Sequence, residues 1–286
     1  MINVSELEFT YSKSKKKAIK AIDFQIQKGE IFGFLGPSGA GKTTTQRIII
    51  GLLRGYNGKV EIMGKERKDW NKDFFEHIGV AFDFPNLYLK LTAEENLKLI
   101  NSYYKKQCTD NELESWLDKV GLLIDKNKKV EGFSKGMKMR LNFIRSIIHD
   151  PEIYFFDEPT SGLDPVNGKI IKDIILDLKN KGKTIFLTTH NMNVAEQLCD
   201  KVAFIVDGKV PVINSPKELM IKYGTQTVCV DYYKNNVEES KEFTLKNIKN
   251  NKGFMDIINN EEIRRIHTQE ATLEDIFIKL TGRELQ

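Results

Sequence analysis

One eight-residue stretch constrains this chain more than any other part of its sequence. It reads Gly-Pro-Ser-Gly-Ala-Gly-Lys-Thr, from Gly36 to Thr43, and it directly follows a continuous apolar run, Ile31 to Leu35. Such a run is typical of a strand that is covered on both faces. The stretch fits the pattern G-x-x-x-x-G-K-[ST], which binds phosphate when it lies between a strand and a helix. The residues therefore predict a phosphate-binding loop and a helix that begins near Lys42.

The residue types of this loop suit the binding of a nucleotide. Glycines let backbone N–H groups approach a phosphate, and the positive end of the following helix adds to the attraction. The pattern predicts that Lys42 reaches the β- and γ-phosphates and that Thr43 is a magnesium ligand. A chance glycine-rich turn is the alternative, and the flanking strand and helix argue against it. We therefore expect the nucleotide to contact the loop and first helical turn: Gly36, Pro37, Ser38, Gly39, Ala40, Gly41, Lys42, Thr43 and Thr44.

A pair of carboxylates stands at the end of a second apolar run. Ile153 to Phe156 is followed directly by Asp157 and Glu158, and ligands bind at the carboxyl ends of parallel strands. We expect Asp157 to hold hydrated magnesium and Glu158 to orient and polarise an attacking water, because phosphoryl transfer depends mainly on positioning and charge neutralisation. Taken alone, the pair could equally be a polar turn after a core strand. The phosphate-binding loop favours the catalytic interpretation.

The spacing of apolar residues predicts an α/β fold. Apolar residues alternate over residues 2–11 and 21–26, which predicts two half-buried antiparallel strands. Strands expected at 153–156, 185–188 and 202–206 alternate with helices, as in a parallel sheet covered on both faces.

Capping signals mark the helices and the domain boundary. Thr92 and Thr109 each precede a glutamate by three residues, which predicts a helical insertion. Asp164 and Ser215 each stand before a proline, the signal of a helix start. The periodicity changes after Gly224, so we expect one domain over residues 1–222, with a helical subdomain at about 85–150, and an extension over 223–286.

Composition excludes several classes of protein. A chain of 286 residues with net charge +4, 40% hydrophobic and 29% charged residues is typical of globular domains and not of disorder. No run approaches the ~20 apolar residues of a membrane span, and no export signal is visible, so we expect a cytoplasmic location. The charge is too small to indicate nucleic-acid binding, and three widely separated cysteines favour neither disulfides nor zinc.

Three further motifs complete a resemblance to a known family. A signature motif, Phe133 to Met137 (Phe-Ser-Lys-Gly-Met), lies between the loop and the acidic pair, and Ser161-Gly-Leu-Asp164 and Thr188-Thr-His190 follow. Together and in this order, the five motifs over residues 1–220 resemble the ATP-binding cassette (ABC) ATPases, whose signature is usually Leu-Ser-Gly-Gly-Gln. The altered signature and the ending, Thr272 to Arg283, resemble the subgroup that serves antibiotic and multidrug exporters.

The resemblance implies roles for residues outside the phosphate-binding loop. Ser134 and Gly136 would face the γ-phosphate of nucleotide held by another subunit, and Asp164 would lie across the dimer interface. Ser134 is also a good helix N-cap in its own right, so a structural role is the alternative. His190 would contact the γ-phosphate and help to hold the catalytic glutamate and the water, while Tyr11 matches the aromatic that stacks on adenine. A structural histidine and an ordinary tyrosine are the alternatives.

One position departs from the family pattern. In the segment from Ile78 to Tyr88, the place of a magnesium-contacting glutamine is taken by Asp83. Aspartate is shorter and lacks the amide donor, but its oxygens suit magnesium directly or through water. An ordinary loop aspartate is the alternative. The segment joins the core to the helical insertion, so it is also the candidate lever between the nucleotide and a membrane partner.

The resemblance implies a fold and a function. The fold is the α/β P-loop core of ABC ATPases, with a mixed sheet, flanking helices, an antiparallel β subdomain and a helical subdomain, plus a small α+β extension. The implied function is ATP hydrolysis, with Mg²⁺, that powers a separate integral membrane permease, and the subgroup implies export of drugs, antibiotics or related compounds. The chain would act as a homodimer or heterodimer on the inner face of the cell membrane, without nucleic acid.

Other functions remain open at this point. One is an ABC-type ATPase that acts on the ribosome or nucleic acid, and another is a nucleotide-regulated scaffold without turnover. The last helix, expected at 272–280, places Leu273, Ile276, Phe277 and Leu280 on one face. That face is expected to pack within the chain or to stabilise or regulate a dimer.

Overall fold

The computed structural model describes residues 1–224, 226–235, 237–269 and 271–282. Two compact units divide the chain: Met1–Asn214 forms the first, and the second begins at Ser215. The domains expected from the sequence, 1–222 and 223–286, differ from these units in the assignment of one helix, α7 (Pro216–Tyr223). This helix belongs to the second unit because it packs against α9 (Leu273–Thr281).

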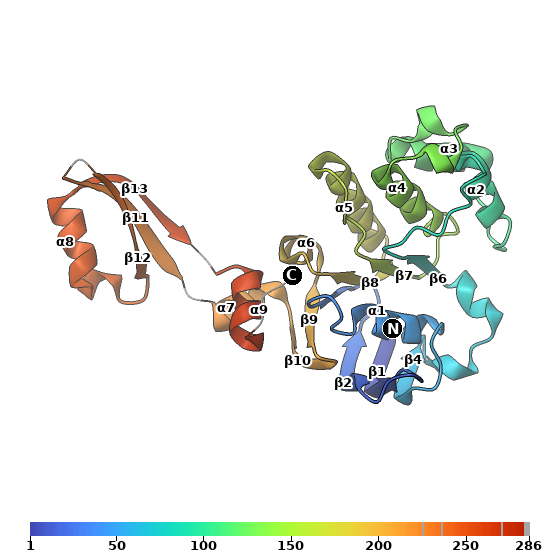
Figure 1. Cartoon of the computed structure of the whole chain (residues 1–286), viewed down its shortest axis with the longest axis horizontal. Helices are drawn as coiled ribbons and strands as arrows, with labels where there is room; N and C mark the ends of the chain where they lie inside the picture. Colours follow the sequence, from blue (N-terminus) through green and yellow to red (C-terminus); the bar gives the residue numbers. More distant parts are fainter. Residues whose placement is uncertain (225, 236, 270, 283–286) are drawn as a thin grey trace. The chain divides into compact units, whose positions relative to one another are not determined.

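A six-stranded sheet lies at the centre of the first unit, in the order β10-β9-β3-β8-β7-β6 (Figure 1). Neighbouring strands from β9 to β6 are parallel, and β10 pairs antiparallel with β9. The strands β3, β7 and β8 are buried along their whole length, as expected for strands covered on both faces. The bounds are β3 Ile31–Leu35, β6 Ile78–Ala81, β7 Ile153–Asp157, β8 Thr184–Thr189, β9 Lys201–Val206 and β10 Lys209–Asn214.

A second, antiparallel sheet packs its apolar face onto this core. Its order is β2-β1-β4-β5, with bounds β1 Ile2–Thr10, β2 Lys17–Ile26, β4 Asn57–Ile62 and β5 Lys65–Glu66. The ring of Phe24 on β2 lies 5.4 Å from that of Phe32 and 5.5 Å from that of Phe34, both on β3. The same core includes Ile48 and Ile49 of helix α1 (Lys42–Ile50). The two antiparallel strands expected near the N-terminus are confirmed.

Three helices of the first unit begin where the capping residues predict. Thr92 and Thr109 form capping boxes, and Asp164 accepts hydrogen bonds from the N–H groups of Val166 and Asn167. No helix in the described residues is both long enough and apolar enough to cross a membrane. The helices are α2 Ala93–Asn101, α3 Asp110–Lys119, α4 Lys135–Arg145, α5 Pro165–Asn180 and α6 Met192–Leu198, with 3₁₀ turns at Arg67–Asp69, Lys72–Glu76, Leu123–Asp125 and Val130–Gly132.

The second unit contains a three-stranded antiparallel sheet with one helix packed against it. The order is β12-β11-β13, with bounds β11 Thr227–Lys234, β12 Val237–Thr244 and β13 Glu262–Gln269; the helix is α8 Lys252–Asn260, after a 3₁₀ turn at Ile248–Asn250. A small core holds them together: Val228, Val230, Tyr232, Phe243 and Ile257. The expected α+β extension is confirmed, although the sequence predicts bounds only for its last helix.

Candidate nucleotide-binding site

The phosphate-binding loop joins β3 to α1, as the sequence predicts. Gly41 is the N-cap of α1, and no side chain caps the helix in its place. The first N–H groups of a helix without such a cap can bind an anion. Glycine is required at two positions: Gly41 has φ +118°, and a Cβ on Gly36 would lie 2.1 Å from the backbone oxygen of Ile205 on β9.

The ammonium group of Lys42 lies inside the loop. Its Nζ donates to the backbone oxygen of Gly36 at 2.5 Å and to that of Pro37 at 3.1 Å. Burial lowers the pKa of Lys42, and the nearby carboxylates of Glu158 and Asp157 raise it. Because both hydrogen-bond partners are neutral carbonyls, a buried cation here is well placed to bind an anionic phosphate.

Asp157 lies at the carboxyl end of β7, beside the first turn of α1. Thr43 Oγ1 donates to Asp157 Oδ2 at 3.2 Å, and Thr188 Oγ1 donates to Oδ1. Burial raises the pKa of Asp157, the two hydroxyl groups lower it, and Asp83 raises it through charge repulsion. Carboxylate and hydroxyl oxygens of this kind are hard donors, which Mg²⁺ prefers. The donor set of Thr43, Asp157 and Asp83 therefore fits the expected metal.

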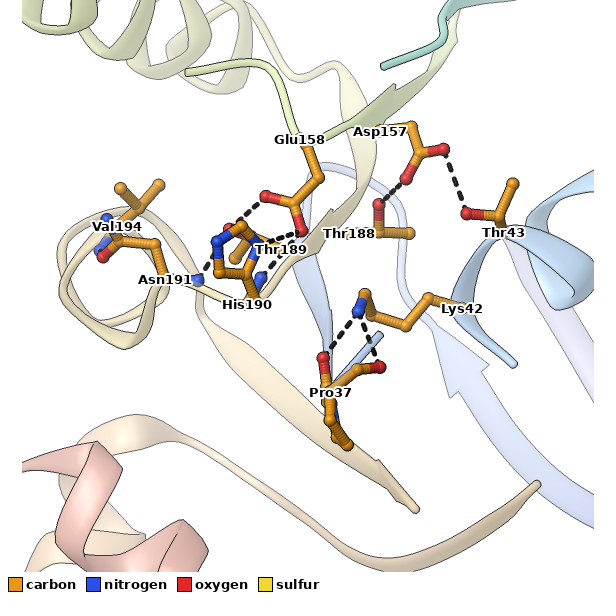
Figure 2. A network of polar contacts seen from close by, with 11 residues as sticks. Pro37, Lys42, Thr43, Asp157, Glu158, Thr188, Thr189, His190, Asn191 and Val194 are labelled. Atoms are coloured by element: carbon orange, nitrogen blue, oxygen red, sulfur yellow. Dashed lines mark hydrogen bonds and ion pairs between the residues drawn. The ribbon is translucent and has the colours of Figure 1, made fainter. Parts of the chain in front are cut away.

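Donors at the end of β8 hold the carboxylate of Glu158. Thr189 Oγ1 donates to Glu158 Oε2 at 3.0 Å, the backbone N–H of His190 donates to Oε1 at 2.9 Å, and the His190 ring Nδ1 lies 2.7 Å from Oε1. Figure 2 shows the two carboxylates directed apart, Asp157 toward Thr43 and Glu158 toward His190. Glu158 also has φ +51°, a left-handed conformation that costs about 1–3 kcal/mol in a non-glycine residue and is frequent at functional sites.

Most of the expected site residues line one cavity of about 340 Å³. Its walls come from the loop, the ends of β7 and β8, and the segment after β6: Ser38, Gly39, Gly41, Lys42, Thr43, Thr44, Asp83, Asp157, Glu158, Ser161 and His190. Gly36 and Pro37 contribute through their contacts with Lys42, and Ala40 is buried within the loop. The cavity is thus surrounded by the ammonium group of Lys42, by oxygen donors and by the carboxylate of Glu158, and it is suited to a chain of phosphates.

Besides Gly36, Pro37 and Ala40, four expected residues lie outside the described lining of this cavity: Tyr11, Ser134, Gly136 and Asp164. Tyr11 is nevertheless adjacent to the loop, since its Oη lies 2.9 Å from Thr44 Oγ1. Ser134 caps α4 by accepting from the N–H of Met137 at 3.2 Å.

Gly136 and Asp164 lie close to one another in the fold. A Cβ on Gly136 would lie 3.5 Å from Leu163 Cδ2, one residue before Asp164, the N-cap of α5. The signature motif therefore contacts the loop before α5 within the same chain.

The two threonines that precede His190 have no role predicted from the sequence. Strands β7 and β8 pair in parallel, with Asp157 opposite Thr188. Each threonine therefore meets one member of the acidic pair: Thr188 donates to Asp157, and Thr189 donates to Glu158. The signal in the sequence is two hydroxyl residues at the end of a strand, but it has meaning only once the neighbouring strand is known.

Comparison with known proteins agrees with this geometry. Residues 19–161 match the family described as ABC transporter. The chain belongs to this family. Residues 226–270 match a second family, described as fluoroquinolone efflux ABC transporter C-terminal domain, and these residues include β11, β12, α8 and most of β13.

Individual ABC proteins are similar over nearly the whole chain. The fluoroquinolones export ATP-binding protein of Mycobacterium tuberculosis (strain CDC 1551 / Oshkosh) is 47% identical over 100% of this chain and 94% of its own length. The bacitracin transport ATP-binding protein of Bacillus licheniformis is 33% identical over 98% of this chain and 97% of its own length.

Solved ABC structures share the fold. An ATP-binding subunit of an ABC transporter aligns with TM-score 0.72 and 28% identity over 78% of this chain and 93% of that one. A dimeric ATP-binding cassette in a post-hydrolysis state, bound to ADP and Pi, aligns with TM-score 0.70 and 28% identity over 75% of this chain and 98% of that one.

These similarities establish the general activity. The chain is an ATP-binding and ATP-hydrolysing subunit of an ABC transporter, of the drug-exporter-like type. An ABC ATPase that acts on the ribosome or nucleic acid is not favoured, because these relatives are named as transport subunits.

Proposed function

We propose that this ABC ATPase powers the export of drugs, antibiotics or related compounds through a separate integral membrane permease. Two relatives that align along nearly their whole length are named for fluoroquinolones export and bacitracin transport, which supports this class of substrate. The match over residues 226–270 supports the same assignment through the second unit. The permease supplies the membrane spans, and this subunit binds it at the cytoplasmic face of the membrane.

The observation that carries the hydrolytic part of the proposal is the meeting of Lys42, Thr43, Asp157, Glu158 and His190 at one cavity. Lys42 binds the β- and γ-phosphates of ATP, with the loop N–H groups around them. Thr43 and Asp157 hold the metal. Mg²⁺, when bound, neutralises charge on the phosphate oxygens. Glu158 orients and polarises the attacking water, and His190 contacts the γ-phosphate.

Two further residues of this chain complete the metal and nucleotide contacts. The carboxylate of Asp83 contacts the metal directly or through water, which its charge repulsion with Asp157 supports. Tyr11 stacks on adenine, and its hydrogen bond to Thr44 places it beside the loop.

A second ABC subunit completes the site. Ser134 and Gly136 contact the γ-phosphate bound to the partner, and Asp164 lies at the interface. The position of these residues outside the described lining of the cavity supports this arrangement, as does the dimeric state of a similar cassette bound to ADP and Pi. The partner is a second copy or a homologue, and the second unit stabilises or regulates the pair.

The permease docks on a groove of two adjoining cavities beside the nucleotide site, of which the first is mainly apolar. One cavity of about 290 Å³ is lined by Leu52, Phe75, Phe82, Tyr104 and neighbouring side chains. A second, of about 590 Å³, shares Leu52 and Phe82 with it.

This second cavity also connects the groove to the nucleotide site. It shares Thr43, Asp83 and Asp157 with the nucleotide cavity. The segment that contains Phe82 and Asp83 therefore lines both the groove and the nucleotide cavity. This supports its role as the lever between ATP and the permease.

The first test is to isolate the protein at native expression from membranes in mild detergent and to identify bound proteins by mass spectrometry. Recovery of a multi-spanning membrane protein supports the transport proposal and provides the subunit in which to look for substrate. Recovery with ribosomes or nucleic acid, without a permease, would contradict it.

The second test addresses the hydrolytic site through Glu158→Gln. Removal of a residue that polarises water is expected to lower hydrolysis on the order of a hundredfold or more, while Mg-ATP binding is kept. The variant should therefore accumulate as an ATP-bound dimer in size-exclusion chromatography. Turnover at the wild-type rate would exclude the role given to Glu158.

A further inference from the structure

The two carboxylate oxygens of Glu158 have different partners. Oε1 receives the backbone N–H of His190 and contacts the His190 ring, whereas Oε2 receives only the hydroxyl of Thr189 among the described residues. Thr189 itself is 1% exposed. The Thr189 hydroxyl is therefore the protein group that holds the second oxygen.

The direction of this hydrogen bond follows from the chemistry of its neighbours. The backbone N–H of Asn191 donates to Thr189 Oγ1 at 3.0 Å. A backbone N–H can only donate and a carboxylate can only accept, so Oγ1 accepts from Asn191 and gives its single proton to Glu158. Asn191 is in turn the N-cap of α6, where its side chain accepts from the N–H of Val194 at 3.1 Å. Thr189 thus links the first turn of α6 to the carboxylate of Glu158 (Figure 2).

We propose that Thr189 is a positioning residue for hydrolysis, which fixes the plane of the Glu158 carboxylate through its hydroxyl group. Rotation about the last bond of a glutamate side chain is soft. The His190 contacts hold Oε1 and the Thr189 hydroxyl holds Oε2, so the plane of the carboxylate is fixed when both oxygens are held. Displacement of a reacting group by ~1 Å can cost about a hundredfold in rate. This inference rests on the proposed function, which gives Glu158 its role.

The experiment compares Thr189→Val with Thr189→Ser in steady-state ATP hydrolysis. Valine keeps the shape without the hydroxyl, and we expect kcat to fall about tenfold or more with KM and the Kd for ATP within about twofold of wild type. Serine restores the hydroxyl and should restore kcat to within about threefold. An equal loss in both variants, or wild-type kcat in Thr189→Val, would overturn the proposal.

Thr184 provides a matched control on the same strand. It is fully buried like Thr189, and its hydroxyl accepts from the backbone N–H of Gly29 at 3.0 Å, at the other end of β8. Thr184→Val should lower stability as Thr189→Val does but keep kcat. If Thr189→Val does not fold, Thr189→Ala against Thr189→Ser gives the same comparison. A loss of kcat in Thr184→Val equal to that in Thr189→Val would show a general effect on the strand and overturn the proposal.

A double-mutant cycle separates this inference from the proposed function. In Glu158→Gln, no carboxylate remains for Thr189 to hold, so adding Thr189→Val should change the residual rate by less than about twofold. A full tenfold loss in that background would show that Thr189 acts through another group. If Glu158→Gln alone hydrolyses ATP like wild type, the proposed function fails first. If it is inactive while Thr189→Val has wild-type kcat, the inference alone fails.

Discussion

The hydroxyl of Thr43 donates to the carboxylate of Asp157, Oγ1 to Oδ2 at 3.2 Å, and so joins the first turn of α1 to the end of β7. The two side chains proposed to hold the metal therefore approach each other from separate elements. Their relative position depends on how α1 packs beside the sheet, which local sequence does not specify.

Thr43→Val removes both this hydrogen bond and the proposed metal ligand. Loss of even an outer-shell partner of a metal ligand typically costs about 10–100-fold in metal affinity, so we expect the Mg²⁺ concentration for half-maximal hydrolysis to rise about tenfold or more. Thr43→Ser should stay near wild type. Thr45→Val is the matched control, since its buried hydroxyl donates to the backbone oxygen of Gly41, the N-cap of the same helix, and not to a carboxylate. Titration of Mg²⁺ at saturating ATP measures the effect, and an unchanged midpoint in Thr43→Val would contradict the assignment.

Gly36→Ala is expected to destabilise the first unit. The added Cβ would lie 2.1 Å from the backbone oxygen of Ile205, so β9 or the loop must shift. Overpacking of this kind costs about 1–3 kcal/mol in the free energy of unfolding.

Gly168→Ala in α5 provides the contrast, because its Cβ would meet nothing within 4 Å and alanine favours a helix by about 0.5–1 kcal/mol. Urea unfolding of both variants measures the difference. A Gly36→Ala protein as stable as Gly168→Ala would disprove the close approach to β9.

His149 predicts a pH dependence of stability. The side chain is 3% exposed, its Nε2 lies 3.0 Å from the oxygen of Ile78, and its ring stacks on Tyr104. Burial lowers the pKa of His149 from 6.5 to about 4, although the Ile78 contact raises it. In the unfolded chain, His149 takes up a proton at its ordinary pKa. The fold therefore keeps its full free energy of unfolding above pH ~6.5 and loses part of it as the pH drops toward ~4.

The expected loss through His149 is about 2 kcal/mol between pH 6.5 and 5, at ~1.4 kcal/mol per pH unit. The free energy of unfolding of wild type and His149→Gln should be compared at pH 7 and pH 5 by urea titration. The wild type should lose more by about this amount. Identical pH dependence in the two proteins would mean that His149 keeps an ordinary pKa in the fold.

Two exposed apolar residues test the docking groove. Leu52 is 54% exposed and lines both cavities of the groove, whereas Ile124 is 95% exposed and lines neither. Leu52→Glu should reduce recovery of the permease from membranes about tenfold, because a charge would be buried in an apolar contact. Ile124→Glu should leave recovery unchanged. Quantitative mass spectrometry of the isolated complexes distinguishes the two, and equal recovery would move the docking surface elsewhere.

Sequence alone predicts the elements whose signals are local. The run Ile31–Leu35 predicts β3 with the same bounds as the structure, and Thr92 and Ser215 each begin a helix as expected. The phosphate-binding loop is also predictable from local sequence, because the glycines and the lysine that it requires lie within eight consecutive residues.

Two elements of the second unit are not predicted from the sequence, for different reasons. Strand β12 carries Val-Glu-Glu-Ser-Lys-Glu-Phe-Thr, in which only Phe243 is buried, so the alternation of apolar residues that marks a strand is absent. Helix α8 does carry a local signal, with Asn251 as N-cap and Phe254, Ile257 and Ile258 on one face, but this signal lies within a segment rich in Asn and Lys. Both are held by pairing and packing with β11 and β13.

The site is predictable as a list of residues but not as an arrangement. The motifs indicate Asp157, Glu158 and His190, but the contacts of Thr188 and Thr189 with the acidic pair depend on which strand neighbours β7. Sheet order is a long-range property of the chain, and single-sequence periodicity does not contain it.

The parallel pairing of Asp157 with Thr188 makes the length of β8 more important than most of its side chains. Apolar residues earlier in the strand can be exchanged for others of similar volume with modest loss. A single inserted or deleted residue, however, would shift the strand by one position and turn each side chain to the opposite face. The hydroxyl groups of Thr188 and Thr189 would then both lose their hydrogen bonds to Asp157 and Glu158. We therefore expect this strand to tolerate substitutions but not changes in length.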